Sequence, residues 1–397
     1  MPTRRSMLTA SLAAAALTVA APIARRTVGE RLSVRTERRL NGVADPGPYL
    51  VSPAAADLHE RLTIVDLHAD SLLWDRDLLL RASRGHVDIP RMVEGNVALH
   101  VFAASTHVPR HLNYERNDDR TDDIRLVAIV QGWPRATWTS RPARAEHLAG
   151  RLRDMAARSD GRLRIIRSAA DLDVVLHARG TNPGIVGGIL AIEGAHALDD
   201  DLANLDRIEA AGYRMVGLAH FFDNAFAGSA QGVAKSGLTG AGRELVAELE
   251  RRRILVDVAH SSRATIDDVL AIATRPVVAS HTGVRGVADN ERNLSDDHLR
   301  AIAATGGMVG IGFWPTASGG TDAASIARSI AHAVAVVGAD HVGLGSDFDG
   351  AVPTPFDASG MALLTAALLS HGLDEATIAA VMGATAVRFL RGALPAT

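Results

Sequence analysis

Histidine and carboxylate side chains recur along this chain directly after short apolar runs. The residues concerned are His68, Asp70, Glu193, His220, His260, His281 and Asp347. Because the sequence contains no cysteine, a transition metal ion must be held by histidine, aspartate or glutamate. A metal ion bound in this way can lower the pKa of a water molecule and polarise a carbonyl group. The residue types therefore indicate metal-dependent hydrolysis.

The spacing of these residues suggests how a pair of metal ions would be held. His68 and Asp70 alternate along an extended chain, so both side chains point the same way and can bind one ion. His260 and His281 follow neighbouring apolar runs and can bind a second ion. Two ions about 3.5–4 Å apart, joined by a carboxylate, can share a water molecule that reacts as a bridging hydroxide.

The carboxylate between the two ions is assigned to Glu193. In some metal-dependent hydrolases with a barrel fold, this bridge is a carboxylated lysine. The single lysine of this chain, Lys235, lies in a loop rich in glycine and serine rather than at the end of an apolar run. Glu193 directly follows the apolar run at 188–192, which makes it the natural bridge.

Eight short apolar or β-branched runs alternate with amphipathic segments from residue 63 onward. We expect strands at 63–67, 97–103, 188–192, 214–218, 254–258, 276–279, 308–313 and 342–345. Several of these runs are continuously apolar, as expected for parallel strands that are buried on both faces. Eight strands, each followed by a helix, predict an α/β fold, the (β/α)8 TIM barrel.

The segment between the second and third expected strands is too long for a single crossover helix. It covers residues 105–183 and has room for two helices and an additional strand at 163–167. We interpret it as a long insertion that folds over the mouth of the barrel. Further along, Thr239, Ser262 and Ser295 each precede a helical pattern and are expected to cap helices.

The metal-binding side chains are expected to meet at one rim, because functional groups of such barrels lie at the C-terminal ends of the strands. A lone histidine after a strand is more often a capping or hydrogen-bonded residue. Six of the eight expected strands end in a metal-binding or ionisable side chain, which is hard to explain by chance. We expect Asp257 to be structural. Asp66 and His196 are expected either to be structural as well or to orient the metal ligands. Eight further histidines are expected to face solvent or to be locally capped, namely His59, His100, His147, His177, His298, His332, His341 and His371.

The N-terminus has the features of an export signal. Arg4 and Arg5 precede an apolar run at 12–24 that is shorter than a membrane-spanning helix. The paired arginines are typical of the twin-arginine pathway, which exports folded proteins. We expect residues 1–24 to be a signal peptide, 25–53 a linker and 54–397 the barrel domain. The protein would then be extracellular or in the cell envelope, without a membrane anchor.

Composition limits the possible partners. The chain has 397 residues, of which 47% are hydrophobic, enough for a sizeable core. Its net charge is −3 and its aromatic content is 4%. There is therefore no basic stripe for a phosphate backbone and there are few rings for stacking on bases. These values argue against a nucleic-acid-binding protein.

The order of these motifs resembles that of the membrane dipeptidase (renal dipeptidase) family, peptidase family M19 of the metallo-dependent hydrolase superfamily. The similarity covers residues 63–391. It rests on D-x-H-x-D at 66–70, E-G-A-H at 193–196, L-A-H at 218–220, D-V-A-H-S at 257–261, S-H at 280–281, R-N at 292–293 and G-S-D-F-D-G at 345–350. One such motif is a weak signal, but seven in this order are highly specific.

The resemblance implies a binuclear dipeptidase with two Zn²⁺ ions per chain, which hydrolyses free L,L dipeptides and also dipeptides with a D residue at the C-terminal position. His68 and Asp70 would bind one zinc ion, His260 and His281 the other, and Glu193 would bridge them. A homodimer is also implied by the resemblance alone.

The resemblance also assigns three residues to substrate and catalysis. Asp347 would accept and donate the protons of the reaction, and His220 would contact the scissile carbonyl group or its oxyanion. Arg292 would pair with the substrate's C-terminal carboxylate, which suits the planar fork of an arginine. From the residues alone, Asp347 could instead be a metal ligand, with Asp349 as the proton carrier. The chain departs from the family at Ala69, which should leave the ligands intact. It also has a more apolar stretch after His220, which affects the expected preference for the substrate side chain.

Two other functions are compatible with the same residues. The first is a metal-dependent amidohydrolase that acts on N-acyl amino acids or lactones, with Arg292 binding another anionic end. The second is an inactive barrel used as a binding protein, although no expected ligand is missing from the sequence. A free dipeptide and its C-terminal amide distinguish the first alternative from a dipeptidase.

Overall fold

The fold is built on nine parallel strands. It is seen in a computed structural model, which describes residue 31 and residues 33–397. The strands are β1 (Ile64–Ala69), β2 (Val97–Ser105), β3 (Leu163–Ile165), β4 (Val186–Glu193), β5 (Tyr213–Gly217), β6 (Leu255–Asp257), β7 (Val278–Thr282), β8 (Met308–Ile311) and β9 (Val342–Leu344). The predicted export signal at 1–24 lies outside the described residues and stays a prediction.

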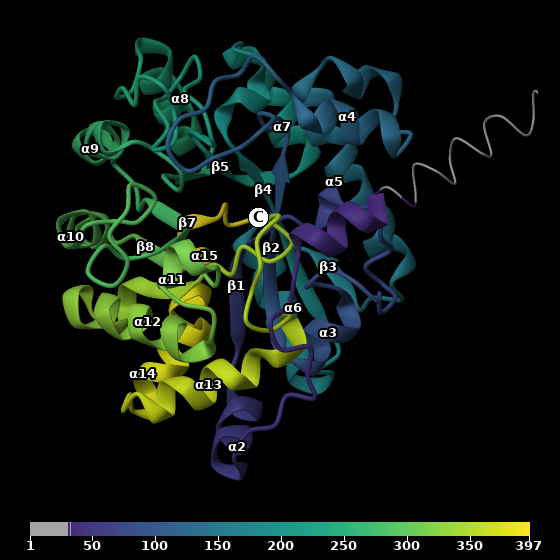
Figure 1. Ribbon diagram of the computed structural model, residues 1–397, viewed down its shortest axis with the longest axis vertical. Coiled ribbons are helices and arrows are strands. Elements are labelled where there is room, and N and C mark those ends of the chain that lie inside the picture. Colours follow the sequence, from purple (N-terminus) through teal and green to yellow (C-terminus); the bar gives the residue numbers. More distant parts are fainter. Residues whose placement is uncertain (1–30, 32) are drawn as a thin grey trace, which may run out of the picture.

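Eight of these strands close into a barrel, which confirms the predicted (β/α)8 fold. The strand order is β2-β1-β9-β8-β7-β6-β5-β4-β3, and an additional pairing of β2 with β4 closes the ring. β3 stays outside the ring because it pairs only with the first residues of β4, from Leu163↔Val186 to Ile165↔Gly188. Figure 1 shows the strands at the centre, with helices around them.

Alternation along the strands divides the core into an inner and an outer layer. In β4, Ile189 and Ala191 pack in one cluster with Met215 and Met308 from other strands, inside the barrel. Leu190, between them in sequence, belongs to the second and larger cluster, which joins strands to helices. All eight residues of β4 are buried, as a strand covered on both faces requires. The barrel is therefore filled with side chains, and only its rim is free to carry function.

Fourteen α-helices follow residue 52 and surround the barrel. They are α2 (Pro53–Arg61), α3 (Ile89–Glu94), α4 (Asp123–Val130), α5 (Arg141–Arg158), α6 (Ala169–Thr181), α7 (Leu205–Ala211), α8 (Gly240–Arg251), α9 (Arg263–Ile272), α10 (Asp296–Ala304), α11 (Pro315–Ser318), α12 (Ala323–Val337), α13 (Met361–Ser370), α14 (Glu375–Ala379) and α15 (Thr385–Ala393). The predicted caps are confirmed, since Thr239, Ser262 and Ser295 each accept a hydrogen bond from a backbone N–H in the first turn of α8, α9 and α10. Among the described residues, no helix is long and apolar enough to span a membrane.

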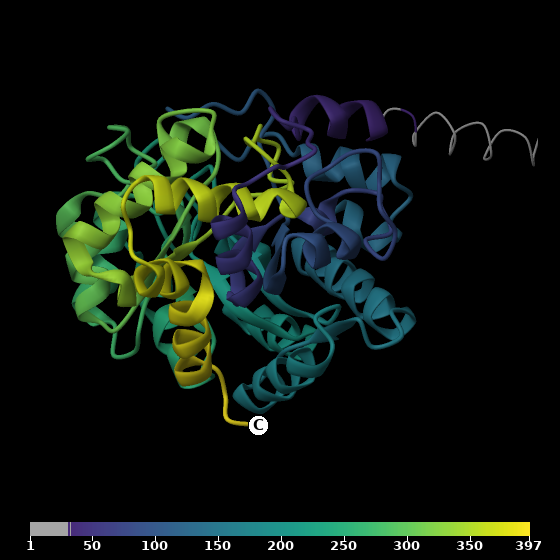
Figure 2. The same ribbon diagram turned by 90° about the horizontal axis from the view of Figure 1, so that it is seen from below.

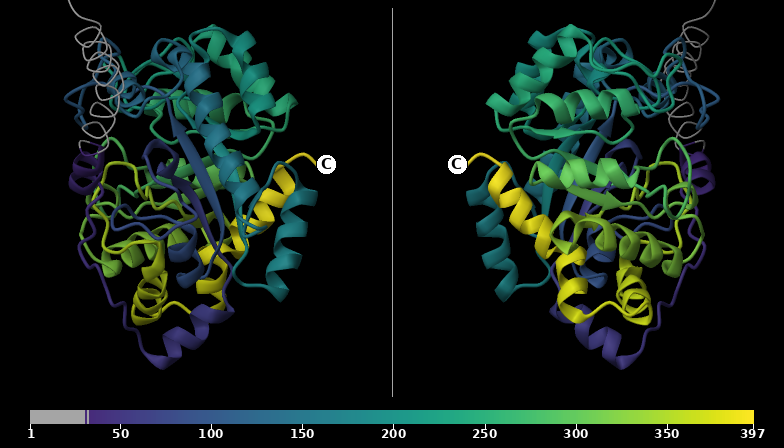
Figure 3. Two further views of the ribbon diagram at one scale, coloured as in Figure 1. Left: turned by 90° about the vertical axis from the view of Figure 1, so that its right-hand side faces the viewer. Right: turned by 90° about the vertical axis from the view of Figure 1, so that its left-hand side faces the viewer.

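The long insertion between β2 and β4 is also confirmed. It contains α4, α5, the outer strand β3 and α6. Its first part reaches the mouth of the barrel, where Val108, Leu112 and Tyr114 line a pocket. Its last helix packs beside the C-terminal helix α15, as Figure 3 shows, and Ala169 donates a backbone hydrogen bond to Pro395.

Part of the segment predicted as a linker at 25–53 lies against the barrel. Residues 33–40 form a helix, and Glu37 in this helix is fully buried. Further along, Val43 forms a parallel bridge with Thr354, in the loop after β9. Figure 2 shows this helix, in purple, on the same side of the barrel as that loop.

Candidate metal and substrate site

The structure brings the seven metal-binding and catalytic candidates together at one end of the barrel. His68 lies in β1, Glu193 ends β4 and His281 lies in β7. Asp70, His220, His260 and Asp347 follow β1, β5, β6 and β9 within a few residues. The carboxyl ends of parallel barrel strands all face the same rim, which is why residues so distant in sequence converge.

Glu193 is the centre of this cluster. Its Oε1 lies 3.4 Å from His68 Nε2, 3.3 Å from His260 Nε2 and 3.5 Å from His281 Nε2. Its Oε2 lies 3.3 Å from His220 Nε2. One carboxylate therefore contacts the imidazoles of four different strand ends, which is the arrangement expected of a bridge between two ligand groups.

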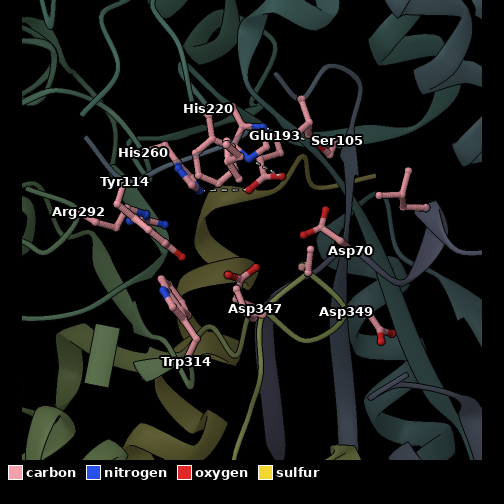
Figure 4. A pocket seen from close by; sticks show the side chains of 17 residues that line it. Asp70, Ser105, Tyr114, Glu193, His220, His260, Arg292, Trp314, Asp347 and Asp349 are labelled. Carbon is pink, nitrogen blue, oxygen red and sulfur yellow. Dashed lines mark hydrogen bonds and ion pairs between the residues drawn. The ribbon is translucent and has the colours of Figure 1, made fainter. Parts of the chain in front are cut away.

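Two further carboxylates lie near His68. His68 Nε2 lies 3.5 Å from Asp70 Oδ2 and 4.0 Å from Asp347 Oδ1. Asp70 is the residue directly after β1, where a short 3-10 helix begins, so it is not part of the extended chain that the sequence suggested. Its side chain nevertheless lies beside that of His68. Figure 4 shows Asp70 and Asp347 facing the same cavity as Glu193.

The donor atoms of this cluster fit divalent cations. His68 Nε2 and Asp70 Oδ1 are buried and have no hydrogen-bond partner among the described residues. Potential ligand atoms lie within 4.8 Å of one another in three groups, which are His68–Glu193–His281, Glu193–His220–His260 and His68–Asp70–Asp347. Buried nitrogen and oxygen atoms that face one another without partners are costly unless a ligand pairs with them. Nitrogen and carboxylate donors of this kind suit zinc.

Burial is the largest cause of the pKa shifts of five groups in this cluster. It raises the pKa of the Glu193 carboxyl to about 7, and it raises the pKa of Asp347 well above its usual value. It lowers the pKa of His220, His260 and His281 well below the usual value of an imidazole. These three rings are therefore neutral, and neutral imidazole is the form that binds metal ions.

A hydrogen-bond relay behind two of the histidines sets their orientation. Ser280 Oγ donates to Asp257 Oδ2 at 2.5 Å, so the same oxygen can accept a hydrogen bond from a ring N–H. It lies 2.9 Å from His281 Nδ1 and 3.4 Å from His68 Nδ1. A proton held on Nδ1 leaves the Nε2 lone pair free, on the side of the ring that faces Glu193.

Above the cluster lies a pocket with about 530 Å³ of empty space, part of it open to solvent. The cluster supplies Asp70, Glu193, His220, His260 and Asp347 to its lining. Its other walls are largely aromatic and aliphatic, and they include Val108, Leu112, Tyr114, Phe221, Trp314 and Val352. The pocket thus combines a polar floor with apolar sides, as small-molecule sites commonly do.

Arg292 is the cation of this pocket. Its side chain is buried, and it donates a hydrogen bond from Nη2 to the carbonyl of His281 at 2.7 Å. Its guanidinium carbon lies 5.4 Å from the centre of the Trp314 ring, and its Nε has no hydrogen-bond partner among the described residues. Burial lowers the pKa of Arg292, which an anionic partner would counteract. A guanidinium held in this way can bind a carboxylate.

Comparisons with known proteins agree with this geometry. Residues 53–394 match the model of the membrane dipeptidase family, peptidase family M19. The chain belongs to this family. A metallopeptidase of family M19 called dipeptidase AC is 29% identical, covers 84% of this chain and 99% of its own, and has a TM-score of 0.68. The same identity and coverage, with a TM-score of 0.67, are found for a Rhodobacter sphaeroides metallopeptidase solved with a phosphinate mimic of the dipeptide L-Ala-D-Ala.

A curated relative supports the same assignment. Dipeptidase verJ of Clonostachys rogersoniana is 28% identical over 312 residues, which are 77% of this chain and 75% of the relative. This M19 protein is thus a metal-dependent dipeptidase by family. The name of the family mentions a membrane, but the described part of this chain contains no helix that could span one.

The two aspartates after β9 in this M19 protein have different surroundings. Asp349 Oδ2 accepts a hydrogen bond from Ser71 Oγ at 2.7 Å and another from Arg76, while its Oδ1 accepts one from the backbone N–H of His86 at 2.7 Å. Burial opposes the charge of Asp349, but Arg76 holds its pKa below the usual value. Asp349 is therefore a fixed structural anion, whereas the Asp347 carboxylate faces the cavity.

Asp66 in this M19 protein joins β1 to the end of β9. Its carboxylate accepts hydrogen bonds from Ser346 N at 2.9 Å, from Ser346 Oγ at 2.5 Å and from His68 N at 3.3 Å. His100 Nδ1 lies 3.5 Å from the same carboxylate. The expectation that His59 and His100 could face solvent is wrong, because both are buried. For His100 the available signal was its place inside the expected strand at 97–103, all of whose residues are buried.

Several residues of the site were missed by sequence reasoning. Ser105 Oγ, at the end of β2, lies 3.5 Å from His220 Nδ1 and can hold the orientation of that ring. Ser280 belongs to the S-H motif at 280–281, but the sequence does not indicate that its hydroxyl contacts Asp257 and His68. Tyr114 and Trp314 line the pocket from segments that the motifs do not include.

Ser280→Ala is expected to weaken metal binding about 10- to 100-fold, the usual effect of losing a group that orients metal ligands. The hydroxyl between Asp257 and the two rings would be lost, and the rings would be free to rotate. Metal affinity is measured by competition with a chelator. Ser329→Ala is the matched control, because this buried hydroxyl on α12 has no hydrogen-bond partner among the described residues. Equal affinities for Ser280→Ala and the unmodified protein would contradict the role given to Ser280.

Proposed function

We propose that this M19 protein is a zinc-dependent dipeptidase that uses two metal ions and hydrolyses free L,L dipeptides and dipeptides with a C-terminal D residue. The observation that carries the proposal is the position of Glu193, whose two oxygens contact the imidazoles of four strand ends. His68 and Asp70 would hold one ion, and His260 and His281 the other. When bound, the ions would supply Lewis acidity and lower the pKa of a water molecule.

Arg292 and the shape of the pocket support a free dipeptide as substrate. A carboxylate that loses its water on binding needs a paired cation, and Arg292 is buried beside the cluster. The Rhodobacter sphaeroides relative was solved with a mimic of L-Ala-D-Ala, which supports a D residue at the C-terminal position. Tyr114, Phe221 and Trp314 would lie against the body of the dipeptide.

Asp347 and His220 would carry out the proton and charge chemistry of peptide hydrolysis. Asp347 would take a proton from the attacking water molecule and pass one to the nitrogen of the leaving amino acid. Its raised pKa brings the group closer to the range in which it can perform both steps. His220, held by Ser105 at Nδ1, would donate a hydrogen bond from Nε2 to the oxyanion that forms on the scissile carbonyl group.

The proposed activity is tested with the metal-free protein. It is loaded with zinc, its metal content is measured, and it is assayed against a panel of L,L and L,D dipeptides that includes L-Ala-D-Ala. We expect two zinc ions per chain and hydrolysis of members of the panel. Two bound ions per chain without hydrolysis of any dipeptide would overturn the proposal.

Arg292→Ala is expected to raise KM for a free dipeptide about 10- to 100-fold, since a hydrogen bond to a charged group contributes about 1.5–3 kcal/mol. A dipeptide with a C-terminal amide should already be a poor substrate, and the substitution should change its hydrolysis little. Arg263→Ala is the matched control, because Arg263 is half exposed and pairs with Glu291. An equal loss for the free dipeptide and the amide would show that Arg292 does not bind the C-terminal carboxylate. Full activity on N-acyl amino acids or lactones alone would favour an amidohydrolase.

A further inference from the structure

The residues that precede the family domain contact the loop that carries Asp347. The match to family M19 begins at residue 53. The N-terminal segment, defined here as residues 33–45, lies before it and contains the helix at 33–40. The β9 loop, defined as residues 345–357, contains Asp347 and supplies Gly350, Ala351 and Val352 to the wall of the pocket.

A buried chain of ion pairs joins the two segments. Glu37 Oε1 lies 2.5 Å from Arg76 Nε, and Glu37 Oε2 lies 2.5 Å from Arg84 Nε. Arg76 also pairs with Asp349 in the β9 loop. Glu37, Arg76 and Asp349 are almost completely buried, so each charge depends on its neighbours rather than on water. Removing the negative charge of Glu37 would leave Arg84 without this partner and Arg76 paired with Asp349 alone.

Backbone contacts continue the same connection. Thr354 donates its N–H to the carbonyl of Gly42 at 2.9 Å, and Ala44 donates its N–H to the carbonyl of Thr354 at 2.9 Å. Ala351 donates its N–H to Oδ1 of Asn41, a buried side chain, at 2.9 Å. Together with the ion pair at Asp349, these bonds hold the β9 loop at Asp349, Ala351 and Thr354.

The β9 loop needs such support because its backbone is strained. Asp347, Asp349 and Ala351 have φ angles of 61°, 62° and 61°, in the left-handed region that residues other than glycine rarely adopt. Conformations of this kind persist only where the surrounding structure fixes them. The fit around Asp347 is also tight, since a Cβ at Gly350 would lie 2.1 Å from Asp347 Oδ1. A small shift of this loop would therefore move the Asp347 carboxylate.

We propose that the N-terminal segment positions the β9 loop for catalysis, and that Glu37 and Asn41 are positioning residues that act through Arg76, Asp349 and Ala351 on Asp347. The inference rests on the proposed function, because Asp347 is the proton carrier of that reaction. It extends the functional unit beyond the family domain to a segment that the sequence alone had marked as a linker.

The test uses Glu37→Gln and Asn41→Ala in the full chain. We expect kcat for L-Ala-D-Ala to fall about 10- to 100-fold in each variant, because displacing a catalytic group by about 1 Å can cost a factor of about 100. Metal content and KM should stay close to those of the unmodified protein, because the five proposed metal ligands and Arg292 lie outside the β9 loop. Asn41→Asp keeps the acceptor for the Ala351 N–H and should retain more activity than Asn41→Ala.

Hydrogen exchange gives a readout that does not depend on activity. The amides of Ala351 and Thr354 donate to the N-terminal segment, so their exchange should be faster in both variants. Glu146→Gln is the matched control, since Glu146 forms an exposed pair with Arg207 through both oxygens. If Glu37→Gln does not fold, Asn41→Ala decides the matter, because it leaves every ion pair intact.

The outcomes separate the two proposals. Unchanged kcat in a folded variant would overturn the positioning role, whether or not exchange is faster. A loss of metal together with kcat would also overturn it, because the effect would then not be confined to the loop. An unmodified protein that binds two zinc ions but hydrolyses no dipeptide would instead contradict the proposed function, and faster exchange in the variants would still show the contact between the two segments.

Discussion

Glu193→Gln is expected to lower hydrolysis of L-Ala-D-Ala by about 10³-fold or more, because a bound metal ion contributes several kcal/mol to the stability of the transition state and each 1.4 kcal/mol changes the rate tenfold. The carboxylate that contacts His68, His260, His281 and His220 would become a neutral amide. An amide offers one oxygen instead of two, and it turns an N–H₂ group toward imidazole nitrogens.

Metal analysis accompanies the activity measurement for Glu193→Gln. We expect the variant to bind fewer than two zinc ions per chain, since the bridge would no longer neutralise and join them. Folding should be preserved, because Glu193 is a buried carboxyl whose pKa is raised to about 7 and whose charge is costly to bury without a cation. Glu146→Gln is the control on an exposed pair. Two zinc ions per chain and unchanged kcat in Glu193→Gln would refute the bridging role.

Asp347→Asn is expected to lower kcat about 10²- to 10⁴-fold, the range that proton transfer by a positioned side chain contributes. The amide cannot take a proton from water or pass one to the leaving amine. KM should change little, because Arg292 and the pocket walls are the groups proposed to hold the substrate. The shape of the β9 loop should also survive, since asparagine tolerates the left-handed backbone at this position, where φ is 61°.

Zinc content decides between the two roles considered for Asp347. Its Oδ1 lies 4.0 Å from His68 Nε2, in the same group of potential ligand atoms as Asp70. If Asp347 carries protons, Asp347→Asn keeps two zinc ions per chain and loses kcat. If Asp347 is a ligand, the variant loses zinc along with activity, and the proposed role is wrong. Asp340→Asn, which removes an exposed charge just before β9, is the control.

The barrel and the convergence of the candidate metal-binding residues could be predicted from the sequence. Short apolar runs separated by capped amphipathic segments specify parallel strands with crossover helices. Once that topology is accepted, Glu193 at the end of β4 and His281 in β7 must face the same rim, although 87 positions separate them in the sequence. The exact conformation was less predictable, since Asp70 lies just past β1 and still reaches His68.

The supporting residues could not be predicted, because their roles depend on partners that are remote in sequence. Ser280 is one of many serines, and its role appears only when Asp257 and His68 are placed beside it. Glu37 belongs to a stretch of mixed charge that has the composition of a linker. Its burial depends on Arg76 and Arg84, which the sequence gives no reason to place next to it.

The walls of the pocket were unpredictable for a different reason. Tyr114 comes from the long insertion, whose length showed that it exists but not which of its side chains reaches the mouth. Trp314 follows β8, a strand whose end carries no candidate metal ligand, so the sequence gives no sign that this strand contributes to the site. Specificity for the substrate side chain is set by such walls, and it is for this reason harder to infer than the chemistry of the floor.

Anomalous diffraction from crystals of the zinc-loaded protein, recorded at the zinc absorption edge, tests the central claim most directly. The account predicts two peaks within bonding distance of the Glu193 carboxylate, one shared with His68 and Asp70 and the other with His260 and His281. A single peak, or peaks that Glu193 does not contact, would contradict it.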